Sequence, residues 1–259
     1  GGGKVAEMIR EDGIDILVEL GGHTAGNRMD VVVRKPAPIQ VTMIGYPNTT
    51  GVEEVDYRIT DGVADPTAWG EERYVEKLLR LSNCFLCYTP PRCGGERGVG
   101  VGKAPCETNG YVTFGSFNNL AKVNGEVLEV WARVLQAVPN SRFVLKCKPF
   151  VNKKSREKIL QDFKKLGISS SRITLLKLVP SNLEHLSSYN CMDISLDCWP
   201  YAGTTTTCES LYMGVPVVTL RGNTHAQNVG ASILSSIGHP EFIARSINEY
   251  LEIAVGLAK

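Results

Sequence analysis

Residues 193–219 read DISLDCWPYAGTTTTCESLYMGVPVVT, and this stretch decides the fold class. The apolar segment Met192–Leu196 is predicted to be a buried strand of the parallel type. A loop that contains Gly203 follows it, four threonines then open a predicted helix over Thr205–Met213, and Val215–Leu220 is predicted as the next strand. A strand, a glycine-containing loop, a helix and a strand in this order indicate a parallel βαβ unit, and hence an α/β fold.

The same alternation extends along the chain in both directions. N-terminal to this stretch, the apolar pattern predicts further strands and helices at Tyr111–Phe114, Glu126–Ala137, Arg142–Lys146, Ser155–Leu166, Ile173–Leu176 and Asn182–Asn190. C-terminal to it, helices are predicted at Asn228–Ser236 and Ile247–Leu257, so Val215–Leu220 is expected to be the last strand. A separate α/β region is predicted near the N-terminus, with strands at Ile14–Leu20, Ile39–Ile44 and Tyr57–Thr60. Residues 88–110, rich in Gly, Pro and charge, are predicted to be a linker or variable insertion.

The composition excludes several classes of protein. The chain has 28 basic and 27 acidic side chains, and a net charge of +1 gives no reason to expect binding to nucleic acid or to a membrane surface. No apolar run reaches the roughly 18 residues that span a bilayer. Gly1–Lys4 has no apolar segment of a secretory signal and is interpreted as a cut end. Eight cysteines, among them the C-x-x-C pair Cys84 and Cys87, have no regular second pair, so we expect reduced thiols in a cytosolic or nuclear protein.

The threonines that open the helix over Thr205–Met213 suit a phosphate. A helix N-terminus presents unpaired N–H groups and a partial positive charge, and the hydroxyls of Thr204, Thr205 and Thr206 add hydrogen-bond donors. Glu209, one turn later, is placed to accept hydrogen bonds from ribose hydroxyls. The alternative is that Thr204 is only a helix cap and the other threonines are helix surface, although threonine has a mediocre helix propensity.

A second candidate is the loop after the strand Tyr111–Phe114, in the sequence FGSFNNLAK at residues 114–122. Ligands of open α/β sheets bind at the C-terminal edge of the strands, where this loop would lie. Lys122 could neutralise a diphosphate and stabilise it as a leaving group. Asn119, in the same loop, is a further candidate for the ligand site, and the alternative for Lys122 is a solvated surface lysine.

The histidines give weaker signals. His185, on a predicted helix, could face a nucleobase, and His23, in a glycine-rich loop, could reach an acceptor or a sugar; a surface position is the alternative for His185. His225 precedes a predicted helix, where capping is the simplest explanation. Asp61, Asp65 and Asp197 have no metal-ligand spacing with these histidines, so no metal site is predicted.

Several long motifs together resemble one known family. They are GHTAGNR at 22–28, RKPAPIQVTMIGYPNTTG at 34–51, DYRITD at 56–61, FGSFNNLAKV at 114–123, VPNSR at 138–142, DISLD at 193–197 and YAGTTTTCESLYMGVPVVT at 201–219. These motifs are similar to the catalytic region of O-GlcNAc transferase homologues, and most similar to the SPINDLY branch. The resemblance covers nearly the whole chain except the 90–108 segment.

The resemblance implies a GT-B fold, in which two Rossmann-like parallel-sheet domains form the enzyme. Residues 1–87 would be a partial, truncated N-terminal catalytic domain, 88–110 the linker, and 111–259 the domain that binds the nucleotide sugar. Tetratricopeptide (TPR) repeats and the first half of the N-terminal catalytic domain would precede the chain, and without them we expect this polypeptide alone to be inactive. The implied activity is inverting, metal-independent sugar transfer to Ser/Thr hydroxyls of nuclear and cytoplasmic proteins, with no cofactor.

The resemblance also carries site residues. Lys122 corresponds to the family's diphosphate-contacting lysine, Thr204, Thr205 and Thr206 to the segment that holds the β-phosphate, and Glu209 to the acidic residue on the ribose. Tyr201 lies in the loop that flanks the nucleotide, His185 near a histidine that packs on the base, and Asn48 in the loop that lines the sugar pocket.

Two departures from the O-GlcNAc transferase motifs concern the sugar donor. Thr204 stands where those transferases have histidine, and Ser181, after Pro180, stands where they have lysine. Both departures favour the SPINDLY-like donor GDP-fucose over UDP-GlcNAc. Transfer of GlcNAc from UDP-GlcNAc remains the first alternative, and a non-catalytic fragment or scaffold that binds partner proteins is the second.

Overall fold

The computed structural model describes residues 1–69, 71–91 and 99–259, which form two compact units. The first unit comprises Gly1–Cys87 with Thr224–Asn228, and the second comprises Tyr88–Asn223 with Val229–Lys259. Residues 92–98 of the predicted linker lie outside the described residues. The segment Thr224–Asn228, which we expected in the second domain, packs with the first unit because His225 and Asn228 hydrogen-bond to residues of that unit.

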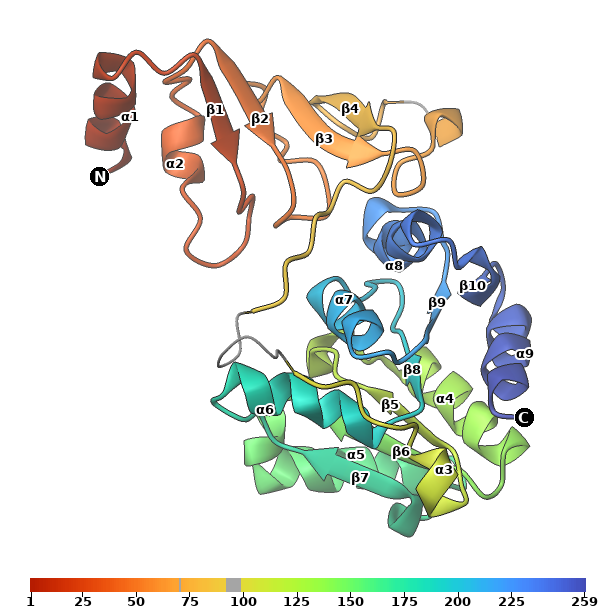
Figure 1. Cartoon of the computed structure of the whole chain (residues 1–259). Coiled ribbons are helices and arrows are strands. Elements are labelled where there is room, and N and C mark those ends of the chain that lie inside the picture. The colour runs from red at the N-terminus through yellow and green to blue at the C-terminus, as the bar shows by residue number, and fades with distance from the viewer. Residues whose placement is uncertain (70, 92–98) are drawn as a thin grey trace. The chain divides into compact units, whose positions relative to one another are not determined.

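The first unit is built on a four-stranded parallel sheet in the order β1-β2-β3-β4 (Figure 1). Its elements are α1 (Gly2–Glu11), β1 (Ile16–Glu19), α2 (Met29–Val32), β2 (Ile39–Thr42), β3 (Tyr57–Asp61), the 3-10 turn η1 (Thr67–Trp69) and β4 (Lys77–Leu81). Strand β4 was not predicted, because Lys-Leu-Leu-Arg-Leu does not alternate cleanly between apolar and polar residues. It is a strand because all five of its residues pair with β3.

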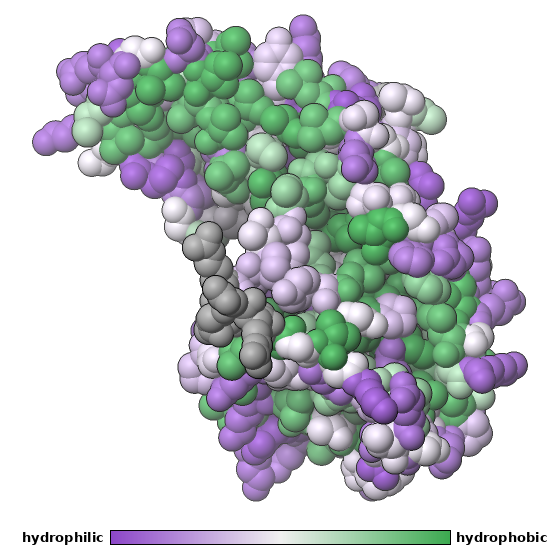
Figure 2. Space-filling view, viewed as in Figure 1, coloured by the Kyte–Doolittle hydropathy of each residue, from purple (hydrophilic) through white to green (hydrophobic). Residues whose placement is uncertain are grey.

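The two faces of this sheet differ in chemistry. Alternate residues of a strand share a face. The residues of one face include the exposed apolar side chains Ile16, Val18, Ile39, Leu79 and Leu81. The opposite face carries the buried polar side chains Gln40, Thr42, Arg58 and Thr60. Figure 2 shows hydrophobic residues gathered over the strands of this unit.

The second unit contains a six-stranded parallel sheet in the order β10-β9-β8-β5-β6-β7 (Figure 1). Its strands are β5 (Thr113–Ser116), β6 (Arg142–Lys146), β7 (Ile173–Leu176), β8 (Ile194–Leu196), β9 (Val217–Leu220) and β10 (Ile243–Ala244). Its α-helices are α3 (Cys106–Asn109), α4 (Gly125–Ala137), α5 (Lys153–Lys165), α6 (Asn182–Ser187), α7 (Thr205–Tyr212), α8 (His225–Ser236, whose first residues belong to the first unit) and α9 (Ile247–Leu257). Its 3-10 helices are η2 (Leu120–Lys122), η3 (Lys148–Val151), η4 (Ser170–Arg172), η5 (Ser188–Cys191) and η6 (Pro240–Phe242).

Apolar side chains cover both faces of this sheet. On one face, Phe114, Phe143 and Leu145 belong to a large core with residues of α4, α5 and α9. On the other, Val144 packs in a smaller core with residues that include Leu186 of α6. Burial on both faces is the rule for parallel sheets flanked by crossover helices, and the apolar runs of these strands reflect it.

Two helix boundaries differ from the predictions by three residues, and one further strand was not predicted. The predicted helix Asn182–Asn190 ends as α6 at Ser187 and continues as the 3-10 helix η5, and α8 starts at His225 rather than Asn228. Val215–Leu220 is not the last strand, because β10 pairs in parallel with β9. A two-residue strand carries too little pattern to be recognised before its partner is known.

No helix in the described part of the chain has the length and apolar character that a membrane crossing requires. The seven described cysteines are free, whereas Cys93 lies outside the described residues.

Candidate functional site

The candidate site of the second unit lies where the strand order of its sheet reverses. Strand β5 pairs with β6 on one side and with β8 on the other, and Phe114 is in register with Ile194. From this pair the chain winds outward in both directions, so the loops that leave β5 and β8 separate there. In open α/β sheets such a switch point is where ligands bind. The two stretches singled out in the sequence, 114–122 and 197–209, are these two loops and the elements that follow them.

Asp197, directly after β8, fixes the shape of the second loop. Its Oδ1 accepts hydrogen bonds from the backbone N–H groups of Cys198 at 2.8 Å and Gly203 at 2.7 Å, and its Oδ2 accepts one from Thr219 Oγ1 at 2.7 Å. Burial raises the pKa of Asp197, while these hydrogen bonds favour its carboxylate. This role of Asp197 was not predicted, although an acid at the end of a buried strand was the available signal.

Gly203 and Asn118 join the two loops. A Cβ on Gly203 would lie 2.6 Å from Thr207 Oγ1 and 2.8 Å from Thr206 Oγ1, so only glycine lets the backbone approach the start of α7 this closely. Thr206 Oγ1 donates to Asn118 Oδ1 at 2.9 Å. The first turn of α7 is therefore tied to the loop that leaves β5.

The threonine-opened helix starts as predicted, at Thr205. Thr204 occupies the cap position, but its side chain makes no capping hydrogen bond in the described structure, so the interpretation of Thr204 as a side-chain cap is wrong. Thr205 is exposed and Thr204 half-buried, whereas Thr207 is buried. The N–H groups of this turn therefore lack a side-chain cap at Thr204, which is the arrangement that favours an anion.

Lys122 comes from the other loop and reaches the same segment. It ends the 3-10 helix η2, whose start is capped by Asn119 Oδ1, which accepts from Ala121 N at 3.1 Å. Its Nζ donates to the carbonyl oxygen of Ala202 at 2.8 Å and lies 3.8 Å from the centre of the Tyr201 ring. Burial lowers the pKa of Lys122. The structure thus brings together Lys122, Tyr201 and the residues that lead into α7.

A cavity of about 890 Å³ adjoins the first of these loops. Phe117, Asn118 and Asn119 line it together with residues after β6, including Lys148 and Asn152. Lys122 and the threonines are not among its lining residues, so this cavity by itself does not enclose the predicted phosphate-binding groups.

Glu209 and His185 form a second cluster in this unit. Glu209 Oε2 lies 2.9 Å from His185 Nε2 and accepts the Tyr189 hydroxyl at 2.9 Å. Lys146 Nζ lies 3.0 Å from His185 Nδ1 and donates to Ser188 Oγ at 2.9 Å. Because an ammonium group can only donate, Nδ1 accepts, and Nε2 carries the proton that it donates to Glu209.

This cluster occupies one carboxylate oxygen of Glu209. The prediction left its carboxylate open to ribose hydroxyls, but one oxygen already holds His185 and Tyr189. Lys146 and Tyr189 were not predicted. The signal for Lys146 was a lysine directly after three apolar strand residues, where a buried ammonium needs a partner. Burial lowers the pKa of Lys146.

The candidates of the first unit, His23 and Asn48, lie on loops at the C-terminal ends of its strands. His23 Nε2 is 2.6 Å from the carbonyl oxygen of Thr50, and the ring meets Tyr46 edge-on with centres 5.2 Å apart. The buried Arg58 holds the loop that carries Asn48, donating to the carbonyl oxygens of Asn48 at 2.8 Å and Tyr46 at 2.9 Å.

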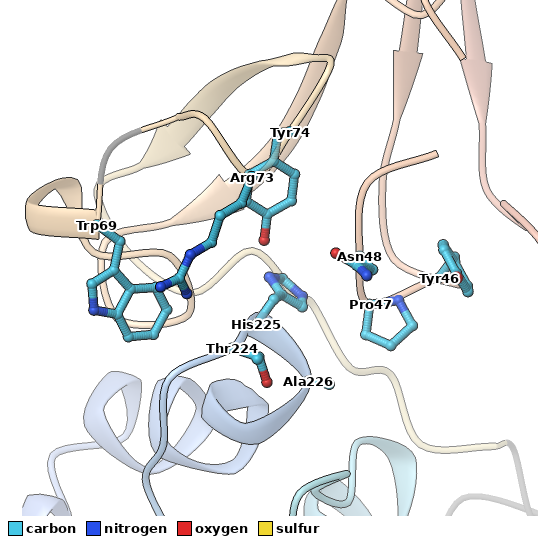
Figure 3. Close-up of a pocket in the computed structure, with 9 residues that line it drawn as sticks. All are labelled: Tyr46, Pro47, Asn48, Trp69, Arg73, Tyr74, Thr224, His225 and Ala226. Atoms are coloured by element: carbon cyan, nitrogen blue, oxygen red, sulfur yellow. The ribbon is translucent and has the colours of Figure 1, made fainter. Parts of the chain in front are cut away.

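Asn48 lines a cavity of about 280 Å³ in this unit, and His23 does not. Figure 3 shows its lining residues, which are Tyr46, Pro47, Asn48, Trp69, Arg73, Tyr74, Thr224, His225 and Ala226. No cluster of histidine, cysteine and acidic side chains suited to a metal ion occurs within residues 1–69, 71–91 and 99–259.

Comparison with known proteins places the chain in a family. The family model described as glycosyl transferase family 41 matches residues 1–89 and 106–259. The chain is 55% identical over 255 residues to an Arabidopsis thaliana protein named probable UDP-N-acetylglucosamine–peptide N-acetylglucosaminyltransferase SPINDLY, and 31% identical over 261 residues to the one named SEC in the same plant. Each match covers 98% of this chain but about a quarter of the relative, 27% and 26%.

A solved structure agrees with these matches. The O-GlcNAc transferase mutant of Thermobaculum terrenum superposes with a TM-score of 0.92 at 36% identity, over 100% of this chain and 48% of that one. The two parallel sheets with their helices have the GT-B architecture that the motifs predicted. The chain therefore belongs to glycosyl transferase family 41.

Proposed function

We propose that this chain binds the nucleotide-sugar donor of a protein glycosyltransferase, and that the donor is GDP-fucose. The observation that carries the proposal is the meeting of Lys122, Gly203 and the start of α7 at the switch point of the second sheet. There the ammonium group of Lys122 contacts Ala202, and α7 begins three residues later at Thr205. Both stabilise negative charge, and both suit a diphosphate.

The same groups would assist the reaction. When the sugar leaves the nucleoside diphosphate, negative charge grows on the β-phosphate, and fixed donors aimed at that charge lower the barrier. We propose inverting transfer to Ser/Thr hydroxyls of nuclear and cytoplasmic proteins, without a metal or another cofactor. Neither nucleic acid nor a membrane is a proposed partner. His185 and Glu209 would contact the base and ribose, and Asn48 and His23 the sugar or the acceptor.

The choice of GDP-fucose rests on two positions. Thr204 replaces the histidine of O-GlcNAc transferase motifs, and Ser181 replaces a lysine. In this chain Ser181 is the N-cap of α6. Its side chain accepts a hydrogen bond from Glu184 N at 3.4 Å and so stabilises the start of that helix. UDP-GlcNAc is the second candidate donor, because the printed names of the SPINDLY and SEC relatives specify it. A partner-binding fragment without nucleotide affinity is the remaining alternative.

Isothermal titration of the chain with GDP, GDP-fucose, UDP and UDP-GlcNAc tests the proposal. We expect guanine nucleotides to bind more tightly than uracil nucleotides. Lys122→Ala should weaken GDP roughly 10- to 100-fold, because a hydrogen bond to a charged group is worth about 1.5–3 kcal/mol. Lys154→Ala, at an exposed lysine of α5, is the matched control and should leave GDP affinity unchanged.

Tighter binding of UDP-GlcNAc would replace the guanine assignment by the uracil one. Absence of binding to all four ligands, or equal affinities of the Lys122→Ala variant and the wild-type chain, would remove the proposed donor site.

A further inference from the structure

Lys146 is a buried cation of the second unit that contacts neutral groups instead of a carboxylate. The residue is 1% exposed, and within the described residues it forms no ion pair. Its Nζ donates to Ser188 Oγ at 2.9 Å and lies 3.0 Å from His185 Nδ1, and the centre of the Phe117 ring is 5.1 Å away. A buried ammonium without a paired carboxylate is costly to keep, so a lysine at this position calls for a role beyond packing.

The hydrogen bonds around His185 run in one direction, from Lys146 to Glu209. Because the ammonium can only donate, His185 Nδ1 accepts, and the proton of the neutral ring lies on Nε2. Nε2 donates this proton to Glu209 Oε2 at 2.9 Å. If Nδ1 carried the proton instead, the lone pair of Nε2 would face the lone pairs of the carboxylate. Lys146 therefore selects the tautomer of His185 that can hold Glu209.

Tyr189 also holds this carboxylate oxygen. Its hydroxyl donates to Glu209 Oε2 at 2.9 Å. Burial and the charge of Glu209 raise the pKa of Tyr189 well above its usual value, so the hydroxyl stays protonated and continues to donate. Both donors meet Oε2, and the other oxygen, Oε1, has no hydrogen-bond partner among the described residues. The side chain of Glu209 is 11% exposed, so Oε1 is the oxygen left to accept from a ligand.

Glu209 lies on the helix whose first turn carries the candidate phosphate-binding threonines. Helix α7 begins at Thr205, and Glu209 follows about one turn later. A nucleotide that places its phosphate at the start of α7 has its ribose directly beside that phosphate in its covalent structure. A carboxylate with one oxygen fixed and the other open accepts the ribose hydroxyls in one defined orientation.

We propose that Lys146 is a positioning residue of the donor site, which acts through His185 to hold the Glu209 carboxylate in the orientation that accepts the ribose hydroxyls. The inference rests on the proposed function, since Glu209 is the ribose contact proposed there. Lys146 itself does not need to touch the nucleotide. Its removal should therefore weaken recognition of the ribose and spare recognition of the diphosphate by Lys122.

Isothermal titration with GDP and with 2′,3′-dideoxy-GDP separates the ribose contact from the rest of the site. The wild-type chain should bind GDP roughly 10- to 100-fold more tightly, because the ribose hydroxyls donate to a charged group. Lys146→Met keeps a long unbranched side chain and removes the ammonium. It should reduce this preference about 3- to 10-fold, the range of one ordinary hydrogen bond, with the affinity for dideoxy-GDP nearly unchanged.

A double-mutant cycle tests the route through Glu209. In Glu209→Ala the preference for GDP over dideoxy-GDP should be absent, and Lys146→Met should reduce it no further in that background. Lys146→Arg restores a cationic donor and should recover most of the preference. Lys154→Met, at an exposed lysine of α5, is the matched control and should keep all of it.

The tautomer of His185 can be measured in the wild-type chain, which tests the route even if Lys146→Met does not fold. The chain is labelled with ¹⁵N-histidine, and the His185 signals are identified among its four histidines by their loss in His185→Gln. We expect the neutral ring to carry its proton on Nε2. A proton on Nδ1 instead would overturn the inference, because Nε2 could not then donate to Glu209.

The outcomes separate this inference from the proposed function. If neither GDP nor UDP binds, or if Lys122→Ala binds GDP as tightly as the wild-type chain does, the proposed function is wrong. If GDP binding responds to Lys122→Ala, an unchanged ribose preference in Lys146→Met defeats this inference alone. Equal losses of affinity for GDP and dideoxy-GDP also defeat it, because they indicate a purely structural lysine. Should UDP bind more tightly than GDP, UDP and 2′,3′-dideoxy-UDP become the test pair.

Discussion

The two parallel sheets of this chain bury different kinds of side chain. In the second unit the strands place apolar residues such as Phe143 and Val144 on opposite faces, and both faces are covered. In the first unit the fully buried positions of the strands include Arg58 and Thr60, while apolar side chains such as Leu79 remain exposed on the other face. The second sheet is thus held by hydrophobic burial, and the first relies more on polar contacts.

The buried polar residues of the first unit are tied to its loops. Gln40 Nε2 donates to the carbonyl oxygens of Val32 at 2.9 Å and Glu54 at 2.8 Å, and Arg58 holds the loop that carries Asn48. Each such contact holds a loop in place and adds about 0.5–1.5 kcal/mol of net stability. The polar contacts of the first unit therefore hold its loops in place, whereas the second unit contains the larger hydrophobic core.

The largest expected effect is on the core of the second unit. Phe143→Ala should destabilise this unit by about 3–5 kcal/mol, because Phe143 is fully buried between Trp131 and Phe163 and its removal leaves a cavity. Leu79→Ala in the first unit is the matched apolar truncation and should change stability by no more than about 0.5 kcal/mol. Hydrogen exchange resolved by peptide measures each unit separately. Comparable losses at the two positions would contradict the contrast between the sheets.

Acid should act in opposite directions on the two buried aspartates. The pKa of Asp65 is lowered from 3.8 to about 2, so it stabilises the first unit above pH 3.8 by about 2 kcal/mol, and this is lost as pH falls through 3.8 towards 2. Burial raises the pKa of Asp197 above 3.8, so its ionised carboxylate destabilises the second unit. This destabilisation is removed as the pH falls through the raised pKa towards 3.8.

Tryptophan fluorescence can follow this acid response by unit, because Trp69 lies in the first unit and Trp131 and Trp199 in the second. Urea unfolding is measured against pH with Trp69→Phe to report the second unit, and with Trp131→Phe and Trp199→Phe combined to report the first. In Asp65→Asn the acid loss in the first unit should vanish. A first unit that keeps its full stability to pH 2 would refute the assignment of Asp65.

A smaller effect is expected at the glycine that joins the loops of the candidate site. Gly203→Ala should cost about 1–3 kcal/mol by overpacking against Thr206 and Thr207, and should weaken GDP binding. Gly125→Ala is the control, since a Cβ there meets nothing within 4 Å, and it should be neutral or slightly stabilising. Thermal unfolding and titration with GDP measure both quantities. Equal behaviour of the two variants would show that the close approach at Gly203 is unnecessary.

The smallest effect concerns the exposed apolar face of the first sheet. Ile16 is 54% exposed, so Ile16→Ser should change the free energy of unfolding by no more than about 0.5 kcal/mol. It should reduce the binding of a hydrophobic dye such as ANS, because it removes part of an exposed apolar patch. A large loss of stability would mean that this face is packed in solution.

The strands and most helices of the second unit could be predicted because their apolar residues recur with a clear period. The helix Ile247–Leu257 was placed correctly, and the helix over Thr205–Met213 was placed to within one residue. Strands β4 and β10 were missed, since one has an irregular pattern and the other only two residues. Their pairing with β3 and β9 makes them strands, and pairing is a non-local contact that the local sequence does not contain.

Some residues of the candidate site could likewise be predicted from the sequence, and others could not. Lys122, Gly203 and the threonines stood out because each follows a strand of the predicted sheet. Two members of the cluster around Glu209 did not, because Lys146 lies 39 residues from its partner His185 and Tyr189 lies 20 residues from Glu209. Asp65 and His225 are 160 residues apart, and neither shows a pattern that predicts the other.

The sequence by itself determined the α/β class, the two loops that carry the phosphate-binding candidates, and the resemblance to a glycosyltransferase family. These depend on short-range periodicity and on contiguous motifs. Only the tertiary structure decided that Lys122 meets the carbonyl of Ala202, that Glu209 is already held by His185, and that Asp65 contacts His225 Nδ1. The contacts of Lys122 and Glu209 are fixed by the parallel crossovers that bring distant strand ends to one edge of a sheet, and local residue preferences do not encode them.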